Sequence, residues 1–385
     1  MLILVCDSFG VGDAPDAAAY GDEGSDTIGN TARAVGGLRA PNLGALGLGM
    51  LTDVPGVPPR AEPGTAHGRF TERSAGKDTT TGHWEMCGLI LPKPFPLYPE
   101  GFPHDVIRSF EREIGRAVLG NVPASGTEII ARLGEEHVRT GKPIVYTSGD
   151  SVFQIACHKD VVDLPTLYAW CRAARRILTG EHNVGRVIAR PFTGRPGNFV
   201  RTPGRRDFSV PPPGPTLLDS CAAAGVAVYC VGKIQDIFAQ QGVTEARYSD
   251  SNDHGVDLAI DYLRRPGPAL VYANLVDFDS TYGHRNDPQG YARCIEELDR
   301  RIPELVGALG GGPMFLTGDH GCDPTTASTD HSRERTPLLG AGLAGGPFDV
   351  GTRSTYADLG ATVADLFDVS TEHLAGESFA AEIDL

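Results

Sequence analysis

The sequence predicts an α/β protein with a doubly wound, mostly parallel sheet, and two observations support this prediction. Short apolar runs recur along the 385 residues, and longer segments with helical spacing of apolar residues separate several of them. Such continuous apolar strands are typical of a parallel sheet covered by helices on both faces. Three of the runs end in carboxylates. Because ligands of such sheets bind beyond the carboxyl ends of the strands, these ends predict the functional site.

The expected strands are the apolar runs Leu2–Cys6, Ile144–Tyr146, Val226–Val231, Ala269–Val276 and Met314–Leu316. The clearest helix is expected over Gly290–Leu309, where apolar side chains recur at helical spacing.

Two proline-rich segments, Lys93–Pro103 and Val210–Thr216, interrupt this pattern. They enclose a stretch with strands and helices of its own. We therefore expect an inserted, smaller α/β cap domain for substrate over residues 93–213. The metal-binding catalytic core is then discontinuous, built from residues 1–92 and 214–385.

Composition and charge narrow the classes of function that the chain can have. A net charge of -15 argues against a general nucleic-acid binder, which needs a basic face, but a local basic patch can still bind an anionic substrate. The eight cysteines form no C-x-x-C pair, and no run of about eighteen apolar residues indicates a membrane span. The opening apolar stretch is too short for a signal peptide. We expect a cytoplasmic protein, monomeric, with neither a nucleic-acid nor a membrane partner.

Candidate metal ligands follow the apolar runs. The set contains three carboxylates and three imidazoles: Asp7, Asp279, His284, Asp319, His320 and His331. This mixed oxygen and nitrogen set suits two divalent ions such as Mn²⁺ or Zn²⁺, of the kind that clamp a transferring phosphate. Each residue alone is more readily explained as a helix cap, a turn former or a satisfied histidine, and the set is more specific than its members.

The segment SAGKDTTTGHWEMCGL, Ser74–Leu89, contains adjacent threonines ahead of an expected helix. A threonine there can carry a phosphate that faces free helix N–H groups, if a metal ion activates the hydroxyl. The alternative is an N-cap threonine followed by a tight turn at Gly82, and this segment alone favours that alternative.

A basic segment follows in the expected cap. It contains six arginines, interspersed with glycines that predict a shaped loop: Arg186, Arg190, Arg195, Arg201, Arg205 and Arg206. Arginine forks bind phosphate oxygens in pairs. The alternative is an ordinary solvated charged face.

Together these segments resemble those of the bacterial phosphopentomutases (phosphodeoxyribomutases) of the alkaline phosphatase superfamily. The resemblance runs from Asp7 to about Gly360 through VCDSFGVGDAPDA, GKDTTTGHWEMCGL, YTSGDSVFQIACH, ARPFTGRPGNFVRT, VGKIQDIF, NLVDFDSTYGHRNDPQGY and GDHGCDPTTASTDHSRERTPLL. It is specific, because other enzymes of the superfamily share the Asp-His and final His segments but not KDTTTGHWE or RPFTGRPGNF.

The resemblance implies an alkaline-phosphatase-like core with an inserted cap, and two manganese ions. One ion would be bound by Asp279, His284 and His331, and the other by Asp7, Asp319 and His320. Of the three adjacent threonines, the resemblance maps the phosphorylated nucleophile to Thr79. The residues expected to contact the sugar phosphate are Ser148, Asp150, Arg186, Arg201 and Lys233.

The implied reaction interconverts ribose 1-phosphate and ribose 5-phosphate, or their 2-deoxyribose analogues, through a phosphothreonine enzyme and a 1,5-bisphosphate intermediate. Glucose 1,6-bisphosphate or ribose 1,5-bisphosphate would activate the enzyme, and its partners would be small-molecule pentose phosphates. The main alternative is a metal-dependent phosphatase or phosphodiesterase of the same superfamily, in which water takes the phosphate. Phosphoglycerate mutation, which would require a serine nucleophile, and a sensor without catalysis are weaker alternatives.

Overall fold

The computed structural model describes residues 1–384, which form two compact units. Unit 1 contains Met1–Pro94 and the described residues from Pro212 onward, and unit 2 contains Phe95–Pro211. Each unit has its own sheet.

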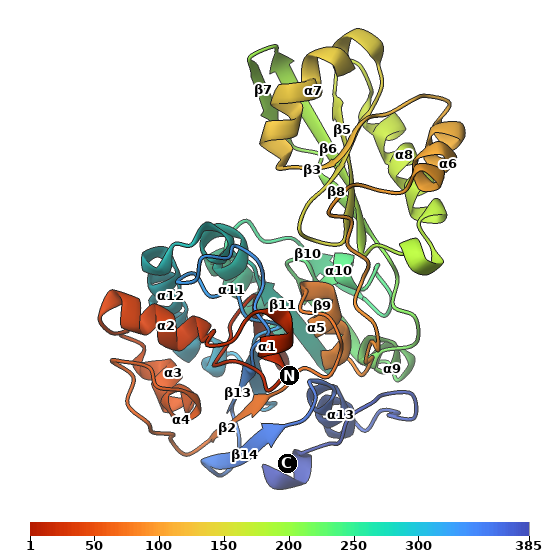
Figure 1. Cartoon of the computed structure of the whole chain (residues 1–385). Helices are drawn as coiled ribbons and strands as arrows, with labels where there is room; N and C mark the ends of the chain where they lie inside the picture. The colour runs from red at the N-terminus through yellow and green to blue at the C-terminus, as the bar shows by residue number, and fades with distance from the viewer. Residues whose placement is uncertain (385) are drawn as a thin grey trace. The chain divides into compact units, whose positions relative to one another are not determined.

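The sheet of unit 1 has eight strands in the order β10-β9-β11-β1-β12-β13-β2-β14. The five strands from β10 to β12 are parallel, whereas β13 runs antiparallel to both of its neighbours and β14 pairs in parallel with β2. In Figure 1 the orange β2 lies between the blue β13 and β14, so early and late parts of the chain share one sheet. The strands are β1 (Leu2–Cys6), β2 (Thr65–Phe70), β9 (Ala227–Val231), β10 (Glu245–Arg247), β11 (Ala269–Leu275), β12 (Met314–Thr317), β13 (Thr336–Ala341) and β14 (Phe348–Arg353).

Helices cover both faces of this sheet, as the buried apolar strands require. On one face, alternate strand residues such as Leu4 and Ala273 pack into a core with four helices: α2 (Thr27–Val35), α3 (Pro41–Ala45), α11 (Asn252–Leu263) and α12 (Pro288–Gly307). On the other face, Tyr272 lies 6.0 Å from Phe238, and Phe315 lies 5.9 Å from Phe379, measured between ring centroids. The predicted doubly wound α/β class is confirmed.

The helical elements of unit 1 are α1 (Ala17–Tyr20), α2 (Thr27–Val35), α3 (Pro41–Ala45), α4 (Leu48–Leu51), α5 (Thr79–Met86), α9 (Leu217–Ala223), α10 (Ile234–Ile237), α11 (Asn252–Leu263), the π-helical turn η2 (Phe278–Tyr282), η3 (Gly283–Arg285), α12 (Pro288–Gly307), α13 (Ala357–Leu366) and η4 (Ala380–Glu382). The expected helix over Gly290–Leu309 corresponds to α12. It begins two residues earlier because Asp287 caps its N-terminus and Pro288 occupies the first turn.

Unit 2 is a smaller α/β unit with a six-stranded sheet in which β3 to β7 lie in order and β8 also pairs with β6. Its elements are α6 (His104–Ile114), β3 (Leu119–Pro123), α7 (Gly126–Thr140), β4 (Ile144–Thr147), β5 (Val152–His158), α8 (Leu164–Ile177), η1 (Gly180–His182), β6 (Arg186–Arg195), β7 (Asn198–Arg201) and β8 (Arg206–Ser209).

The basic segment is not the shaped loop that its glycines predicted. It forms the β6–β7 hairpin and β8, with Gly197 in the tight turn at a positive φ of 81°. The apolar residues between the arginines decide this outcome, because Val187 and Ala189 are buried against α8 on one face of β6.

Within residues 1–384, no helix is both long and apolar enough to cross a membrane. All eight cysteines are buried and unbridged.

Candidate functional site

The carboxyl ends of three neighbouring strands bring the candidate ligands together. Asp7 directly follows β1, Asp279 lies in the π-helical turn after β11, and Asp319 and His320 follow β12. Because β1 pairs in parallel with both β11 and β12, residues more than 270 positions apart end at the same sheet edge. π-Helical turns are frequent at functional sites.

The first ligand group consists of Asp7, Asp319 and His320, whose ligand atoms all lie within 4.8 Å of one another. His320 Nε2 is 3.5 Å from Asp7 Oδ1 and 3.4 Å from Asp319 Oδ2. All three side chains are buried.

The second group forms around the two oxygens of Asp279. Asp279 Oδ2 lies 3.3 Å from His284 Nε2, and Asp279 Oδ1 lies 3.4 Å from His331 Nε2. The rings of His331 and His320 stack with centroids 3.8 Å apart, so the two groups adjoin. The structure therefore places all six predicted ligands in one cluster.

The three imidazoles are oriented by backbone carbonyls. Nδ1 of His284 donates to Thr329 O at 2.7 Å, Nδ1 of His331 to Lys77 O at 3.0 Å, and Nδ1 of His320 to Gly321 O at 3.0 Å. With the proton on Nδ1, the lone pair of each Nε2 faces the carboxylates. This is the arrangement by which metal-binding histidines are held in proteins.

The electrostatics of the cluster also fit cations. Asp7 Oδ1, Asp279 Oδ1 and Asp319 Oδ2 are buried and accept no hydrogen bond within residues 1–384, although imidazole nitrogens lie 3.4–3.5 Å away. Burial and the charge of Asp319 raise the pKa of Asp7. Burial acts in the same direction on Asp279 and Asp319, but the neighbouring imidazoles, when protonated, hold the pKa of both below the usual value. Positive charge nearby therefore stabilises the ionised form of these carboxylates. Divalent metal ions supply such charge, and carboxylates and imidazoles are suitable ligands for them.

Two residues near the cluster were missed by the sequence analysis. Cys322 lies beside the second group: its Sγ is 4.0 Å from His284 Nδ1, and Cys322, His284 and Asp279 offer ligand atoms that all lie within 4.8 Å of one another. His83 Nδ1 lies 2.9 Å from Thr79 O and 3.4 Å from Asp319 Oδ2, and it links helix α5 to the ligands. The only signals in the sequence were their places directly after Gly321 and Gly82.

Thr79 is the first residue of α5, and its Oγ1 lies 3.2 Å from His320 Nε2. The N-cap is Asp78, not a threonine, and Asp78 accepts both the N–H and the hydroxyl of Thr81. Gly82 does not form a turn as the alternative expected. It lies within the helix, where a Cβ would overlap the carbonyl of Asp319, so glycine permits the close approach.

Comparison with known proteins agrees with this geometry. A family model described as the Metalloenzyme superfamily matches residues 1–371. A phosphopentomutase of Anaeromyxobacter dehalogenans (strain 2CP-C) is 58% identical over 100% of this chain and 98% of its own length. Phosphopentomutases of Acetivibrio thermocellus and Dictyoglomus turgidum are 55% and 52% identical, each over at least 98% of both chains. The chain belongs to the phosphopentomutase family.

As a phosphopentomutase family member, the chain is an isomerase of the intramolecular phosphotransferase class. The predicted family and enzyme class are confirmed. Membership in the metalloenzyme superfamily further implies that it binds divalent metal.

The side chains predicted to contact the sugar phosphate belong partly to unit 1 and partly to unit 2. Lys233 follows β9, and its Nζ is 3.3 Å from Asp7 Oδ2. In unit 2, Ser148 and Asp150 follow β4, and Asp150 Oδ2 lies 3.4 Å from Arg186 Nη2. Arg201 ends β7 with an exposed side chain.

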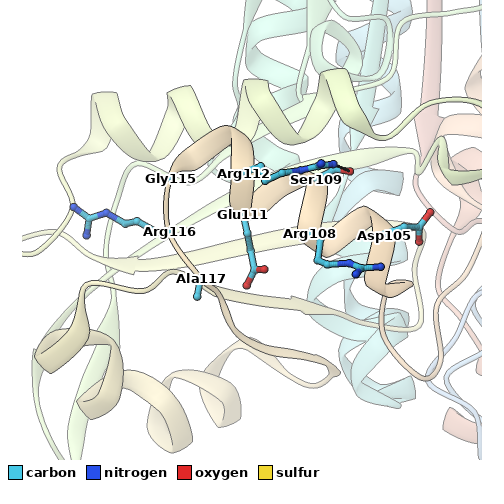
Figure 2. Close-up of a pocket in the computed structure, with 8 residues that line it drawn as sticks. All are labelled: Asp105, Arg108, Ser109, Glu111, Arg112, Gly115, Arg116 and Ala117. Atoms are coloured by element: carbon cyan, nitrogen blue, oxygen red, sulfur yellow. Dashed lines mark hydrogen bonds between the residues drawn. The ribbon is translucent and has the colours of Figure 1, made fainter.

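Other arginines of the basic segment are engaged inside unit 2. Arg205 forms a two-point contact with Asp207 at 2.9 Å, and Arg190 donates to Gln154 at 3.0 Å. Burial lowers the pKa of Arg190 to about 10. A groove of about 570 Å³ lies elsewhere in this unit, along α6 and the turn that follows it (Figure 2), and is lined by none of the five predicted sugar-phosphate contacts.

Proposed function

We propose that the chain interconverts ribose 1-phosphate and ribose 5-phosphate, and their 2-deoxyribose analogues, with Thr79 as the residue that carries the phosphate. One observation supports this role above all. The hydroxyl of Thr79 is the one that lies beside the ligand cluster, 3.2 Å from His320 Nε2, at the first position of a helix. Thr81 uses its hydroxyl to contact Asp78, and Thr80 is buried.

Asp279, His284 and His331 are proposed to hold one divalent ion, and Asp7, Asp319 and His320 the other, with Mn²⁺ as the ion. When bound, such ions supply positive charge that favours the threonine alkoxide and stabilises the transferring phosphoryl group. The start of α5 presents backbone N–H groups to a phosphate on Thr79.

The reaction then requires only two transfers through one residue. A hydroxyl of the pentose phosphate attacks phosphorylated Thr79, so a sugar O–P bond forms as the threonine O–P bond breaks, and the hydroxyl proton is released. The resulting 1,5-bisphosphate reorients and returns its other phosphate to Thr79. Glucose 1,6-bisphosphate or ribose 1,5-bisphosphate would supply the first phosphate.

Ser148, Asp150, Arg186, Arg201 and Lys233 are proposed to bind the pentose phosphate. Unit 1 would thus be the catalytic core and unit 2 the substrate domain. Arginine forks and the lysine ammonium match phosphate oxygens, and the acidic and hydroxyl side chains match sugar hydroxyls. The eight unbridged cysteines support a reducing, cytoplasmic location. We propose that the enzyme acts there as a monomer.

The test is to incubate the protein with Mn²⁺, a trace of glucose 1,6-bisphosphate and ribose 1-phosphate, and to follow ribose 5-phosphate and free phosphate together. The proposal expects ribose 5-phosphate without matching release of phosphate. Intact-protein mass spectrometry with fragmentation should find the added phosphate on Thr79. Thr79→Ala should lose both phosphoenzyme and turnover, whereas Thr80→Ala should keep part of each. Free phosphate as the main product would favour the phosphatase alternative.

A further inference from the structure

The segment Glu72–Asp78 has no regular structure and leads from β2 to helix α5, which begins at the proposed nucleophile Thr79. We call it the approach segment. A single side chain from a distant part of the chain, Arg333, contacts it repeatedly. Arg333 Nη1 donates to Glu72 Oε2 at 2.6 Å and Nη2 donates to Glu72 O at 2.8 Å; Nη1 also donates to Ser74 O at 2.8 Å and Gly76 O at 2.6 Å.

Two further donors complete the pattern. Tyr20 Oη donates to Ala75 O at 3.0 Å, and His331 Nδ1 lies 3.0 Å from Lys77 O. The four consecutive carbonyls from residue 74 to residue 77 therefore all accept hydrogen bonds from side chains outside the segment. Arg333 supplies two of these bonds, and its guanidinium also lies over the Tyr20 ring, 4.9 Å from the centroid.

Arg333 is itself held firmly. Only 2% of its side chain is exposed, and its Nε and Nη2 donate to Asp16 at 3.0–3.2 Å. Its backbone N–H donates to Asp22, which also receives the Lys77 ammonium at 2.9 Å. A buried guanidinium is costly unless its donors are all satisfied, and here its planar fork satisfies them in a geometry that a lysine cannot reproduce.

We propose that Arg333 is a positioning residue for phosphoryl transfer at Thr79. It stands two residues after His331, and it joins the backbone that carries this proposed ligand to the backbone that carries the proposed nucleophile. Its contacts fix the position of one of these backbone segments relative to the other. The inference rests on the proposed function of Thr79. Because small displacements of a reacting group slow transfer strongly, loss of the fork should reduce the rate of transfer more than it weakens substrate binding.

The test compares Arg333→Lys with the wild type, both loaded with Mn²⁺. We expect phosphoenzyme formation from glucose 1,6-bisphosphate and kcat to fall about 10- to 100-fold, with the KM for ribose 5-phosphate changed less than about threefold. Amide hydrogen exchange over residues 72–78 should become faster. The matched control is Arg353→Lys. Arg353 is also an ion-paired, mostly buried arginine of unit 1, but it contacts Asp358 and Glu382, and its replacement should leave transfer unchanged.

Wild-type transfer in folded Arg333→Lys, or an equal loss in Arg353→Lys, would overturn the inference. If Arg333→Lys does not fold, Asp16→Asn replaces it, because Asp16 is 46% exposed and orients the guanidinium from outside. This variant should show a several-fold loss of kcat and faster exchange over residues 72–78, and wild-type values for both would again overturn the inference. If the wild type forms no phosphoenzyme, the proposed function fails. Hydrogen exchange then still decides whether Arg333 holds the approach segment.

Discussion

Removal of divalent metal should lower the free energy of unfolding of unit 1, by an amount set by the binding of two ions to its ligand cluster. Three buried carboxylates, Asp7, Asp279 and Asp319, face one another across three imidazoles, and each has an oxygen that accepts no hydrogen bond within residues 1–384. Two ions at 100 times their dissociation constants stabilise the folded state by about 2.7 kcal/mol each, or about 5 kcal/mol together. For a unit of this size, 1 kcal/mol shifts Tm by about 2 °C. Saturation with Mn²⁺ should therefore raise Tm by about 10 °C over the chelated protein.

The assay is a thermal unfolding series in which the chelated protein is titrated with Mn²⁺. Asp279→Asn removes the carboxylate shared by His284 and His331, so about half of the shift should disappear. Asp277→Asn is the matched control. Asp277 lies two residues away, but it accepts the backbone N–H of Asn252, which an asparagine oxygen can also accept. The reasoning is refuted if the wild type shows no shift, or if Asp277→Asn loses as much of it as Asp279→Asn.

Three further predictions concern single side chains. Glu85→Gln should lower the free energy of unfolding by about 2 kcal/mol in urea titrations, because the buried carboxylate accepts four hydrogen bonds, including that of Ser74 N–H, and an amide must leave one donor unpaired. Burial raises the pKa of Glu334 from 4.5 to about 8, so its contribution to stability is fully present below about pH 4.5 and is lost as pH rises to about 8. The Tm of Glu334→Gln minus the Tm of the wild type should therefore increase over this pH range. A constant difference in Tm would contradict the assignment. Arg201→Ala should raise the KM for ribose 5-phosphate roughly 10- to 100-fold, which is the value of one charge-assisted hydrogen bond. Arg205→Ala removes an arginine that is already paired inside unit 2, so it should change the KM little. Equal effects of the two substitutions would argue against Arg201 as a phosphate contact.

Much of this protein follows from local patterns in its sequence. Apolar runs such as Leu2–Cys6 and Ala269–Val276 indicate strands because strands buried in a sheet covered on both faces are continuously apolar. The carboxylates that follow them identify the site edge, since parallel strands end together. Motif spacing around Thr79 and His331 was specific enough to indicate the family. Each of these patterns lies within one short segment of the chain, so the sequence shows it directly.

Only the tertiary structure decided the rest. It showed that the hydroxyl of Thr79, and not that of Thr81, lies beside His320, because Asp78 occupies the cap position and takes the Thr81 hydroxyl. It turned the basic segment into strands because buried residues such as Val187 pack against α8. It also brought Arg333 to carbonyls more than 250 residues earlier in the chain. Hydrogen bonds and packing between such distant residues form only when the sheet aligns the strands, and no local pattern of residue types records which partner each group will meet.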